Sequence, residues 1–592
     1  MVSPRKSDPH LASRCHRAIL RTARSWPSLA PWLLSVAVLV LFLPTWVLHI
    51  RRTIDVYAFN DDARILIWPF FKTSDPTLFP QDPFVPYYQA GLPEGFRILY
   101  RLLGHLELVR PASEWIQYLS VIVVTVILAI TARRLAGNLA AFLAVVLVLG
   151  SDAFFDRAGG GLPRAFAFPL ISAGLYALVT ARPMLLAGLA LAGAAFYPVV
   201  AALLGACLLV LLLVFPAQPR PSGAQSVAPT RVSRWTWRRR VGLLLMTLLG
   251  IVLLSIPMLL RLRPYGDPIT PAMLSAFPEA GLGGRLSPEH HPPFEGLLSL
   301  LMRHSRVALL GAGEPIGAGI ARWIRSDEQR ANWVVLIGIA LAALRVALGS
   351  RTRPELRRLL ILPLIACALH PFACALAPRL FLPERYAQFA VPPFVVVLVA
   401  VACGEPFFSS GPDRLGRAYW HYASAVAVLI ALAGRGTSWV GIEVYVPPRE
   451  RPLYAAVANL PKNAVVAGWP AGPVENIPHL AQRRVLTNFQ LEMPFHAGFT
   501  LESRARLDAF FEAYFATSLL PIERLCTEYQ VTHLLVDRNQ FVRSAPDYYE
   551  PHRNRIHRLY AAAHGRFVLL DELIREPSTL HFDGGLSLIE LS

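Results

Sequence analysis

Charged residues are scarce in this chain of 592 residues, where they make up 16% of the sequence. A typical soluble protein carries about a quarter. Lysine occurs only as Lys6, Lys72 and Lys462, so arginine supplies almost all of the positive charge. The shortfall of charge is concentrated in repeated long apolar runs, which raise the mean hydropathy to +0.44. This pattern argues against a soluble globular fold and predicts a polytopic α-helical membrane protein.

Cysteine is also sparse, with six residues, and no CxxC, zinc-binding or haem-attachment pattern is present. Cys526 is the only cysteine of the long C-terminal region, so that region holds no internal disulfide. The absence of a Walker loop and of a GxGxxG motif argues against nucleotide binding. The formal charge of +18 does not indicate a nucleic-acid partner. The densest basic clusters lie beside apolar runs, where the positive-inside rule for membrane proteins explains them.

These clusters predict a topology with a basic cytoplasmic N-terminus (1–29) and a transmembrane domain (30–435). The domain is expected to have about 11 helices and external loops at 50–114, 151–165 and 261–331. The run from Met184 to Phe215 is too long for one helix across a core of about 30 Å, so Phe196-Tyr197-Pro198 should divide it. Residues 295–325 alternate apolar and basic side chains, which is typical of a segment lying on the membrane. The last helix is expected at about 418–434.

The pattern of apolar residues changes after the long apolar runs end. Residues 436–592 predict a small extracytoplasmic α/β domain, with helical spacing at 501–517, 521–530 and 552–564. Short buried strands are expected at Ala464–Gly468, Arg484–Asn488, Thr532–Val536, Phe567–Leu570 and Leu586–Leu591.

The first external loop carries two adjacent acids, Asp61 and Asp62, followed by Arg64 among aromatic residues. A carboxylate near a low-dielectric boundary is costly unless it is paired or used. One interpretation is a solvated loop in which both acids cap a helix over Ala63–Phe71. The other is a functional site, and the remaining external loops favour it.

Three further external elements carry candidate site residues. The second loop contains Asp152, Asp156, Arg164 and the glycines Gly159–Gly161, which could also form a plain flexible turn. The third contains His290 and His291, flanked by proline and readable as an ordinary loop feature. Before a late helix stand Glu384, Arg385 and Tyr386, of which Arg385 could simply anchor that helix at the headgroups.

This layout resembles the GT-C superfamily of membrane glycosyltransferases, in particular some of its bacterial members. Pro383-Glu384-Arg385-Tyr386, followed by Pro392-Pro393, is similar to the RY segment at a late helix in several such families. The run from Gly160 to Pro169 is similar to one in the bacterial members. The doubled acid after Asn60 departs from the lone Asp or separated pair that related enzymes often show, so either Asp61 or Asp62 could be the base.

The resemblance implies transfer of a sugar from a polyprenyl-phosphate donor, within the membrane lipids, to a glycan, lipid or protein acceptor. The similarity to bacterial members also implies a location in the bacterial plasma membrane. Asp62 or Asp61 would accept the hydroxyl proton, while Arg385, Tyr386 and Arg164 would bind the donor phosphate. Substrate-binding roles would fall to Arg64, Asp152, Asp156, His290 and His291. Superfamily members differ in metal use, so Mg or Mn held by Asp61 or Asp62 with Asp152 or Asp156 stays open.

One argument favours Asp62 as the base. Neighbouring side chains on a helix diverge by about 100°, so both acids should not face one hydroxyl. Asp61, nearer the helix start, should accept backbone N–H bonds, which make a carboxylate a weaker base.

Two other classes of function remain open. A transporter or a polymerase-like protein could handle lipid-linked glycans without this chemistry, although no inverted repeat is visible and the helix interiors hold almost no acids. A non-catalytic membrane scaffold could instead bind a partner through its C-terminal domain.

Overall fold

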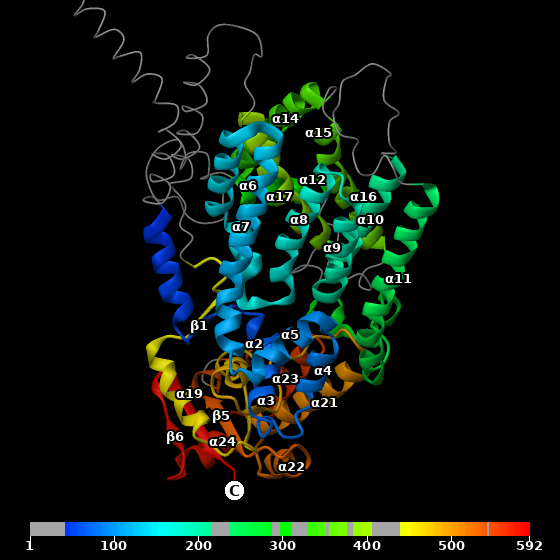
Figure 1. The fold of residues 1–592 in the computed structure, drawn as a ribbon. Helices are drawn as coiled ribbons and strands as arrows, with labels where there is room; N and C mark the ends of the chain where they lie inside the picture. The colour runs from blue at the N-terminus through cyan, green and yellow to red at the C-terminus, as the bar shows by residue number, and fades with distance from the viewer. Residues whose placement is uncertain are drawn as a thin grey trace, which may run out of the picture.

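The computed structural model describes residues 42–214, 236–286, 297–310, 328–350, 354–375, 383–404, 439–541 and 544–591. Figure 1 shows a bundle of long helices at one end of the molecule and a smaller region of helices and short strands at the other. The predicted cytoplasmic segment, the helix expected at 418–434 and the pair His290–His291 lie outside the described residues.

The long helices of the bundle confirm a polytopic membrane protein. Five of the described helices are long and apolar enough to cross a membrane. The described helices of the bundle span 42–54, α6 Val109–Leu149, α8 Ala167–Val179, α9 Pro183–Phe196, α10 Pro198–Val214, α11 Trp237–Leu262, α12 Leu297–Leu310, α14 Glu328–Ser350, α15 Pro354–Leu359, α16 Ile361–Ala375 and α17 Arg385–Gly404.

Two breaks divide the apolar runs, and the sequence predicts the second of them. Helix α6 is interrupted at Ala136 and at Gly137, whose φ of +85° favours glycine, so it consists of two helical segments. Helices α9 and α10 are separated at Tyr197, which is extended, because Pro198 has no N–H to continue the hydrogen-bond ladder. The predicted division of the long run is confirmed.

Helix α17 forms the centre of the bundle. Most of its residues are buried, and it packs against α6, α8, α12, α14 and α16. Leu300 of α12 contacts Ala387, Val391 and Val395 of α17 in one apolar cluster. Helix α17, which begins at Arg385, is therefore enclosed by other helices along most of its length.

The first loop is more broken than the sequence predicts. The expected helix over Ala63–Phe71 is interrupted at Ile67, because Pro69 cannot donate a backbone hydrogen bond there. The loop comprises β1 Ala58–Phe59, α2 Ala63–Leu66, η1 Trp68–Phe70, α3 Phe71–Ser74, α4 Phe84–Ala90 and α5 Glu94–His105.

The C-terminal region contains a five-stranded sheet in the order β4-β3-β5-β7-β6. The first three strands are parallel, and the last two pair antiparallel. The strands are β3 Val465–Gly468, β4 Arg484–Val485, β5 His533–Asp537, β6 Leu580–His581 and β7 Leu586–Glu590. The helices are α19 Arg451–Ala458, α20 Ile477–Leu480, α21 Ala497–Tyr514, α22 Leu520–Tyr529, α23 His552–Ala562 and α24 Val568–Asp571.

Four of the five predicted strands are present, although β4 is only two residues long. The strand expected at Phe567–Leu570 is wrong, because these residues enter the short helix α24. An apolar run of four residues fits a strand and a buried helical turn equally well.

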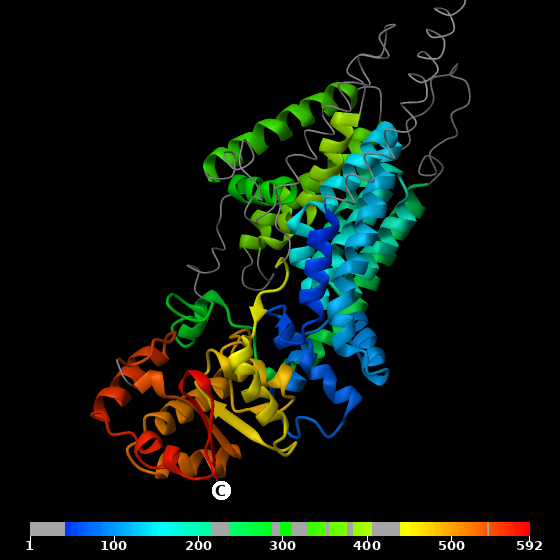
Figure 2. The ribbon, with the colours of Figure 1, turned by 90° about the vertical axis from the view of Figure 1, so that its left-hand side faces the viewer.

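The first loop and the C-terminal region share a hydrophobic core. Trp68, Phe70 and Tyr100 of the loop pack in one buried cluster with Leu453 and Val466 of the C-terminal region. Figure 2 shows the loop, in blue, beside the C-terminal strands and helices in yellow and orange. The two acids of the loop thus lie where the bundle meets the C-terminal region.

Candidate active site

A two-stranded ribbon positions the acidic pair. Strand β1 pairs antiparallel with β2 Val444–Tyr445, with Ala58 opposite Tyr445 and Phe59 opposite Val444. The Glu443 amide extends this ribbon by donating to the Phe59 carbonyl at 3.2 Å. The segment after β1 therefore lies directly against the segment that precedes β2.

Asp62 faces the bundle and forms an ion pair with Arg164. A second nitrogen of Arg164 donates to the Asn60 side-chain oxygen at 3.1 Å. That oxygen also accepts the Asp62 amide at 3.1 Å, while the Asn60 amide group donates to the Gly441 carbonyl at 3.1 Å. Asn60, which is 2% exposed, thus joins the acid, the arginine and the segment before β2.

Asp61 faces the C-terminal region. It forms an ion pair with Arg64 and accepts a hydrogen bond from the Gln490 side chain at 3.3 Å. Arg64 is buried and also donates to Glu475 at 3.2 Å and to Asn476 at 2.8 Å. Burial raises the pKa of Glu475 above its usual range, and Arg64 opposes that rise.

The expected capping role of the acids is wrong. Asp62 occupies the N-cap position of α2 without a side-chain cap, and the Asp61 carboxylate accepts from side chains instead of from backbone N–H groups. Arginine guanidinium groups lie within reach of both carboxylates, and a charge-assisted hydrogen bond is stronger than a neutral one. The two side chains have different partners, Arg64 for Asp61 and Arg164 for Asp62.

The glycines of the second loop allow three segments to approach closely. A side-chain carbon at Gly159 would lie 2.7 Å from the Gly441 carbonyl oxygen, and one at Gly161 would lie 2.5 Å from the Tyr100 hydroxyl. Gly160 has a φ of +77° and contacts Asn60. This turn is therefore tightly packed, and it brings Arg164 to Asp62.

Three arginines lie around Tyr197 at the start of α10. Arg157, Arg164 and Arg385 are all close enough to interact with it electrostatically. Arg157, on α7 Asp152–Ala158, pairs with Asp156 at 2.9 Å. Arg385 is 9% exposed and donates to Gln388 at 2.9 Å, while its buried Nε has no hydrogen-bond partner among the described residues. Such a buried, under-satisfied cation is suited to an anionic ligand.

Two other predicted site residues have different surroundings. Asp152 is 1% exposed at the start of α7. Asp61 and Asp62, with which it was expected to share a metal ion, bond instead to Arg64 and Arg164. Tyr386 is buried in the bundle core, near Tyr197. Among the described residues, no group of three His, Cys, Asp or Glu side chains is arranged to hold a metal ion, so no metal ligand is assigned here.

Sequence reasoning missed Glu443, Glu475 and Gln490. Partial desolvation raises the pKa of Glu443 even though its side chain reaches solvent, and Arg164 opposes that rise. Three neighbouring carboxylates raise it further, namely Asp156, Asp62 and Asp61. Glu443 therefore belongs to the acidic side of the site.

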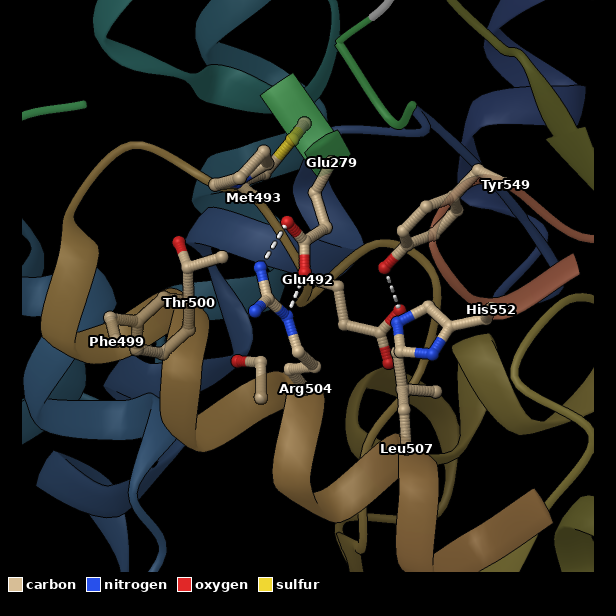
Figure 3. Close-up of a pocket in the computed structure, with 11 residues that line it drawn as sticks. Glu279, Glu492, Met493, Phe499, Thr500, Arg504, Leu507, Tyr549 and His552 are labelled. Carbon is tan, nitrogen blue, oxygen red and sulfur yellow. Dashed lines mark hydrogen bonds and ion pairs between the residues drawn. The ribbon is translucent and has the colours of Figure 1, made fainter. Parts of the chain in front are cut away.

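The segment that carries Gln490 is held in place by Glu492. The buried Glu492 carboxyl accepts hydrogen bonds from Thr487 at 2.6 Å, Tyr548 at 2.7 Å and Tyr549 at 2.8 Å. Figure 3 shows Glu492 and Tyr549 beside His552, in a small pocket across from the paired Glu279 and Arg504. Gln490 also receives a hydrogen bond from Arg285 at 3.4 Å, which turns its amide nitrogen towards Asp61.

No family model matches the sequence, and no curated protein matches it. Three solved structures are similar to this one over most of the chain, each with a TM-score below 0.5. One is ArnT from Cupriavidus metallidurans in the apo state, with 14% identity, 96% of this chain and 98% of that chain covered, and a TM-score of 0.48.

Two further similar structures are larger than this chain. One is the archaeal oligosaccharyltransferase AglB from Archaeoglobus fulgidus in complex with an inhibitory peptide and a dolichol-phosphate. It has 13% identity over 86% of this chain and 70% of that chain, with a TM-score of 0.43. The apo form of the oligosaccharyltransferase from the same organism has a TM-score of 0.42. The arabinofuranosyltransferase AftD from Mycobacteria has 13% identity over 95% of this chain and 40% of that chain, with a TM-score of 0.48.

Proposed function

We propose that this protein is a membrane glycosyltransferase that moves a sugar from a polyprenyl-phosphate-linked donor to an acceptor hydroxyl. The observation that carries the proposal is the ion pair between Asp62 and Arg164 at the junction of the bundle and the C-terminal region. It places a carboxylate next to buried guanidinium groups. Transfer from a lipid-linked donor needs these two groups, one for the acceptor proton and one for the leaving phosphate.

Asp62 is the proton acceptor in this proposal. Its Oδ2 atom pairs with Arg164, whereas its Oδ1 atom has no hydrogen-bond partner among the described residues. Both oxygens of Asp61 are engaged, by Arg64 and Gln490. The Asp62 side chain is 35% exposed, so an acceptor hydroxyl can reach it from solvent.

The donor phosphate is assigned to Arg385 and Arg164. Both are buried, and a dry surrounding strengthens their attraction for an anion. As the sugar–phosphate bond breaks, negative charge grows on the phosphate oxygens, and fixed guanidinium groups stabilise that charge without reorganising. The sugar then bonds to the acceptor oxygen, whose proton passes to Asp62.

The acceptor side of the membrane is assigned to the pole that carries the C-terminal region. Arg357 and Arg358 lie on α15, at the opposite pole (Figure 1). Arg134, just before the break in α6, is close enough to Arg358 to interact with it electrostatically, so it lies at the same pole. Arginine-rich helix ends favour the cytoplasm, which puts the C-terminal region outside.

The test is sugar transfer from a matched polyprenyl-phosphate donor by purified protein and by variants that fold normally. Asp62→Asn should lose roughly two to four orders of magnitude in rate, the scale of general-base catalysis. Asp61→Asn should lose far less. Asp75→Asn is the matched control, because Asp75 lies in the same loop and pairs with Lys462 on the surface. If Asp61→Asn and Asp62→Asn both retain full activity, the catalytic assignment is wrong, as a scaffold would predict.

A further inference from the structure

Helix α5 of the first loop has apolar side chains on two opposite faces. Phe96 and Tyr100 are fully buried and pack into the core that the loop shares with the C-terminal region. On the other face, the side chains of Ile98, Leu102 and Leu106 are 50%, 58% and 65% exposed. Residues four apart lie on one side of a helix, so these three form a continuous stripe, here called the α5 stripe. A contiguous apolar surface of this kind marks a contact with something outside the core.

Both ends of α5 are fixed to the ends of long apolar helices. Arg261, in the last turn of α11, pairs with Glu94 in the first turn of α5 at 2.5 Å. At its other end α5 stops at His105, and α6 begins at Val109. Helices α6 and α11 are both long and apolar enough to cross a membrane. Helix α5, which lies between the bundle and the C-terminal region (Figure 1), therefore runs along the boundary of the membrane.

The α5 stripe continues into the lipid-facing surface of α6. The exposed apolar side chains in the first half of α6 recur every three or four residues, which places them on one side of the helix: Trp115, Leu119, Ile122, Val126 and Ile130. Because α6 is a candidate membrane span, this side faces the acyl chains. Its first member is Trp115, and tryptophan is enriched where a span meets the headgroups. The membrane boundary therefore lies beside the end of α5.

We propose that α5 is an interfacial helix, whose stripe of Ile98, Leu102 and Leu106 inserts among the lipid headgroups on the side of the C-terminal region. The apolar face of such a helix lies about 5–10 Å deep in the boundary between headgroups and acyl chains. Arg101 is exposed beside the stripe, where its stem covers apolar surface while its charge reaches the lipid phosphates. The partner of the α5 stripe is thus the lipid bilayer itself.

This contact fixes the depth of the proposed active site. On the opposite face of α5, the Tyr100 hydroxyl donates to the Gly161 carbonyl at 2.7 Å. Gly161 belongs to the turn that brings Arg164 to Asp62. With lipid on one face of α5 and the glycine turn on the other, Arg164 is held at a set distance from the headgroups. The inference concerns membrane contact and goes beyond the proposed sugar transfer.

The test is spin-label accessibility in the full-length protein, reconstituted in nanodiscs of phosphatidylethanolamine and phosphatidylglycerol. Labels are placed singly in Ile98→Cys, Leu102→Cys and Leu106→Cys after the native cysteines are replaced. Oxygen concentrates in lipid, whereas a nickel chelate stays in water, so the ratio of their collision rates with the label reports insertion. We expect this ratio to be several-fold higher at all three positions than in Leu520→Cys. Leu520 is the matched control, because it is a leucine that is 72% exposed at the start of α22, remote from the bundle (Figure 1).

Two results would overturn the proposal. Access of the nickel chelate to the α5 stripe equal to its access to Leu520 would show that the stripe faces water. Protection from both reagents would show that protein covers the stripe, either a second copy or another segment of this chain. Thermal unfolding identifies a variant that does not fold, and the other two positions then decide. Because accessibility is measured without a sugar donor, failure of the proposed function would leave this test unchanged.

Discussion

Arg164 and Asp62 form an ion pair across 102 residues of sequence, linking the segment before α8 to the first loop. Beside this contact Gly159 packs closely against Gly441, because a side-chain carbon at Gly159 would lie 2.7 Å from the Gly441 carbonyl oxygen. The pair joins a donor-binding candidate to a proton-accepting candidate in one contact. Changing either partner should therefore affect binding and chemistry together.

Replacing Arg164 or Arg385 by lysine should reduce transfer roughly ten- to hundred-fold. Arg164 uses two nitrogens on two partners, Asp62 and Asn60, whereas lysine has a single nitrogen. Initial rates at several donor concentrations measure the effect. Arg449→Lys is the control, because that side chain is 70% exposed. Full activity in Arg385→Lys would show that Arg385 only anchors α17 at the headgroups.

Cysteines introduced at Ser74 and Ser578 should both react with an impermeant thiol reagent in intact spheroplasts. Both positions are exposed, the first in the first loop and the second before β6. The expectation follows from the arginine-rich opposite pole. The background protein needs its native cysteines removed, and lysed spheroplasts serve as the labelling control. Protection of either cysteine in intact cells would contradict the proposed topology.

The C-terminal region should lose stability as the pH rises from about 4.5 to about 7. Burial raises the pKa of Glu492 to about 7, with three hydrogen bonds opposing the rise. The folded state therefore holds a proton that the unfolded chain releases above its ordinary pKa. The stabilisation of the folded state by this proton is complete below the ordinary pKa of a glutamate, 4.5, and is lost as the pH rises through 7. The free energy of unfolding should fall by roughly 3 kcal/mol over this range.

Thermal unfolding of the wild type and of Glu492→Gln across this pH range checks the expectation. Glutamine stays neutral at every pH, so the variant should show a flatter dependence. Glu528→Gln is the control, because Glu528 is 48% exposed and pairs with Arg524. Parallel curves for the wild type and Glu492→Gln would show that Glu492 remains ionised in the folded protein.

The sequence predicts much of the architecture, because the features that determine it can be recognised from neighbouring residues. These features are the long apolar runs, the arginine clusters and Pro198. The division of α9 from α10 follows from such a local signal. Strands β3, β5 and β7 are likewise short apolar runs between turns. A run of four apolar residues is ambiguous, which is why the turn at Val568–Asp571 could not be assigned.

The site was predictable only in part. The acids and Arg164 could be chosen by residue type, but their partners depend on tertiary contacts. Glu443 and Gln490 belong to the C-terminal half of the chain, and no spacing in the sequence relates them to Asp61. The capping role failed for a related reason: the arginine that binds Asp62 comes from another segment, so its competition with backbone N–H groups is invisible locally.

The ribbon of β1 and β2 also has a consequence for biosynthesis. Asp61 and Glu443 are 382 residues apart, so a ribosome adding about 5–20 residues per second makes the second roughly 20 to 80 s after the first. During that interval the first loop already exists, but its partner strand does not. A nascent chain in the membrane therefore carries an incomplete site, and a chain that ends before residue 443 never completes one.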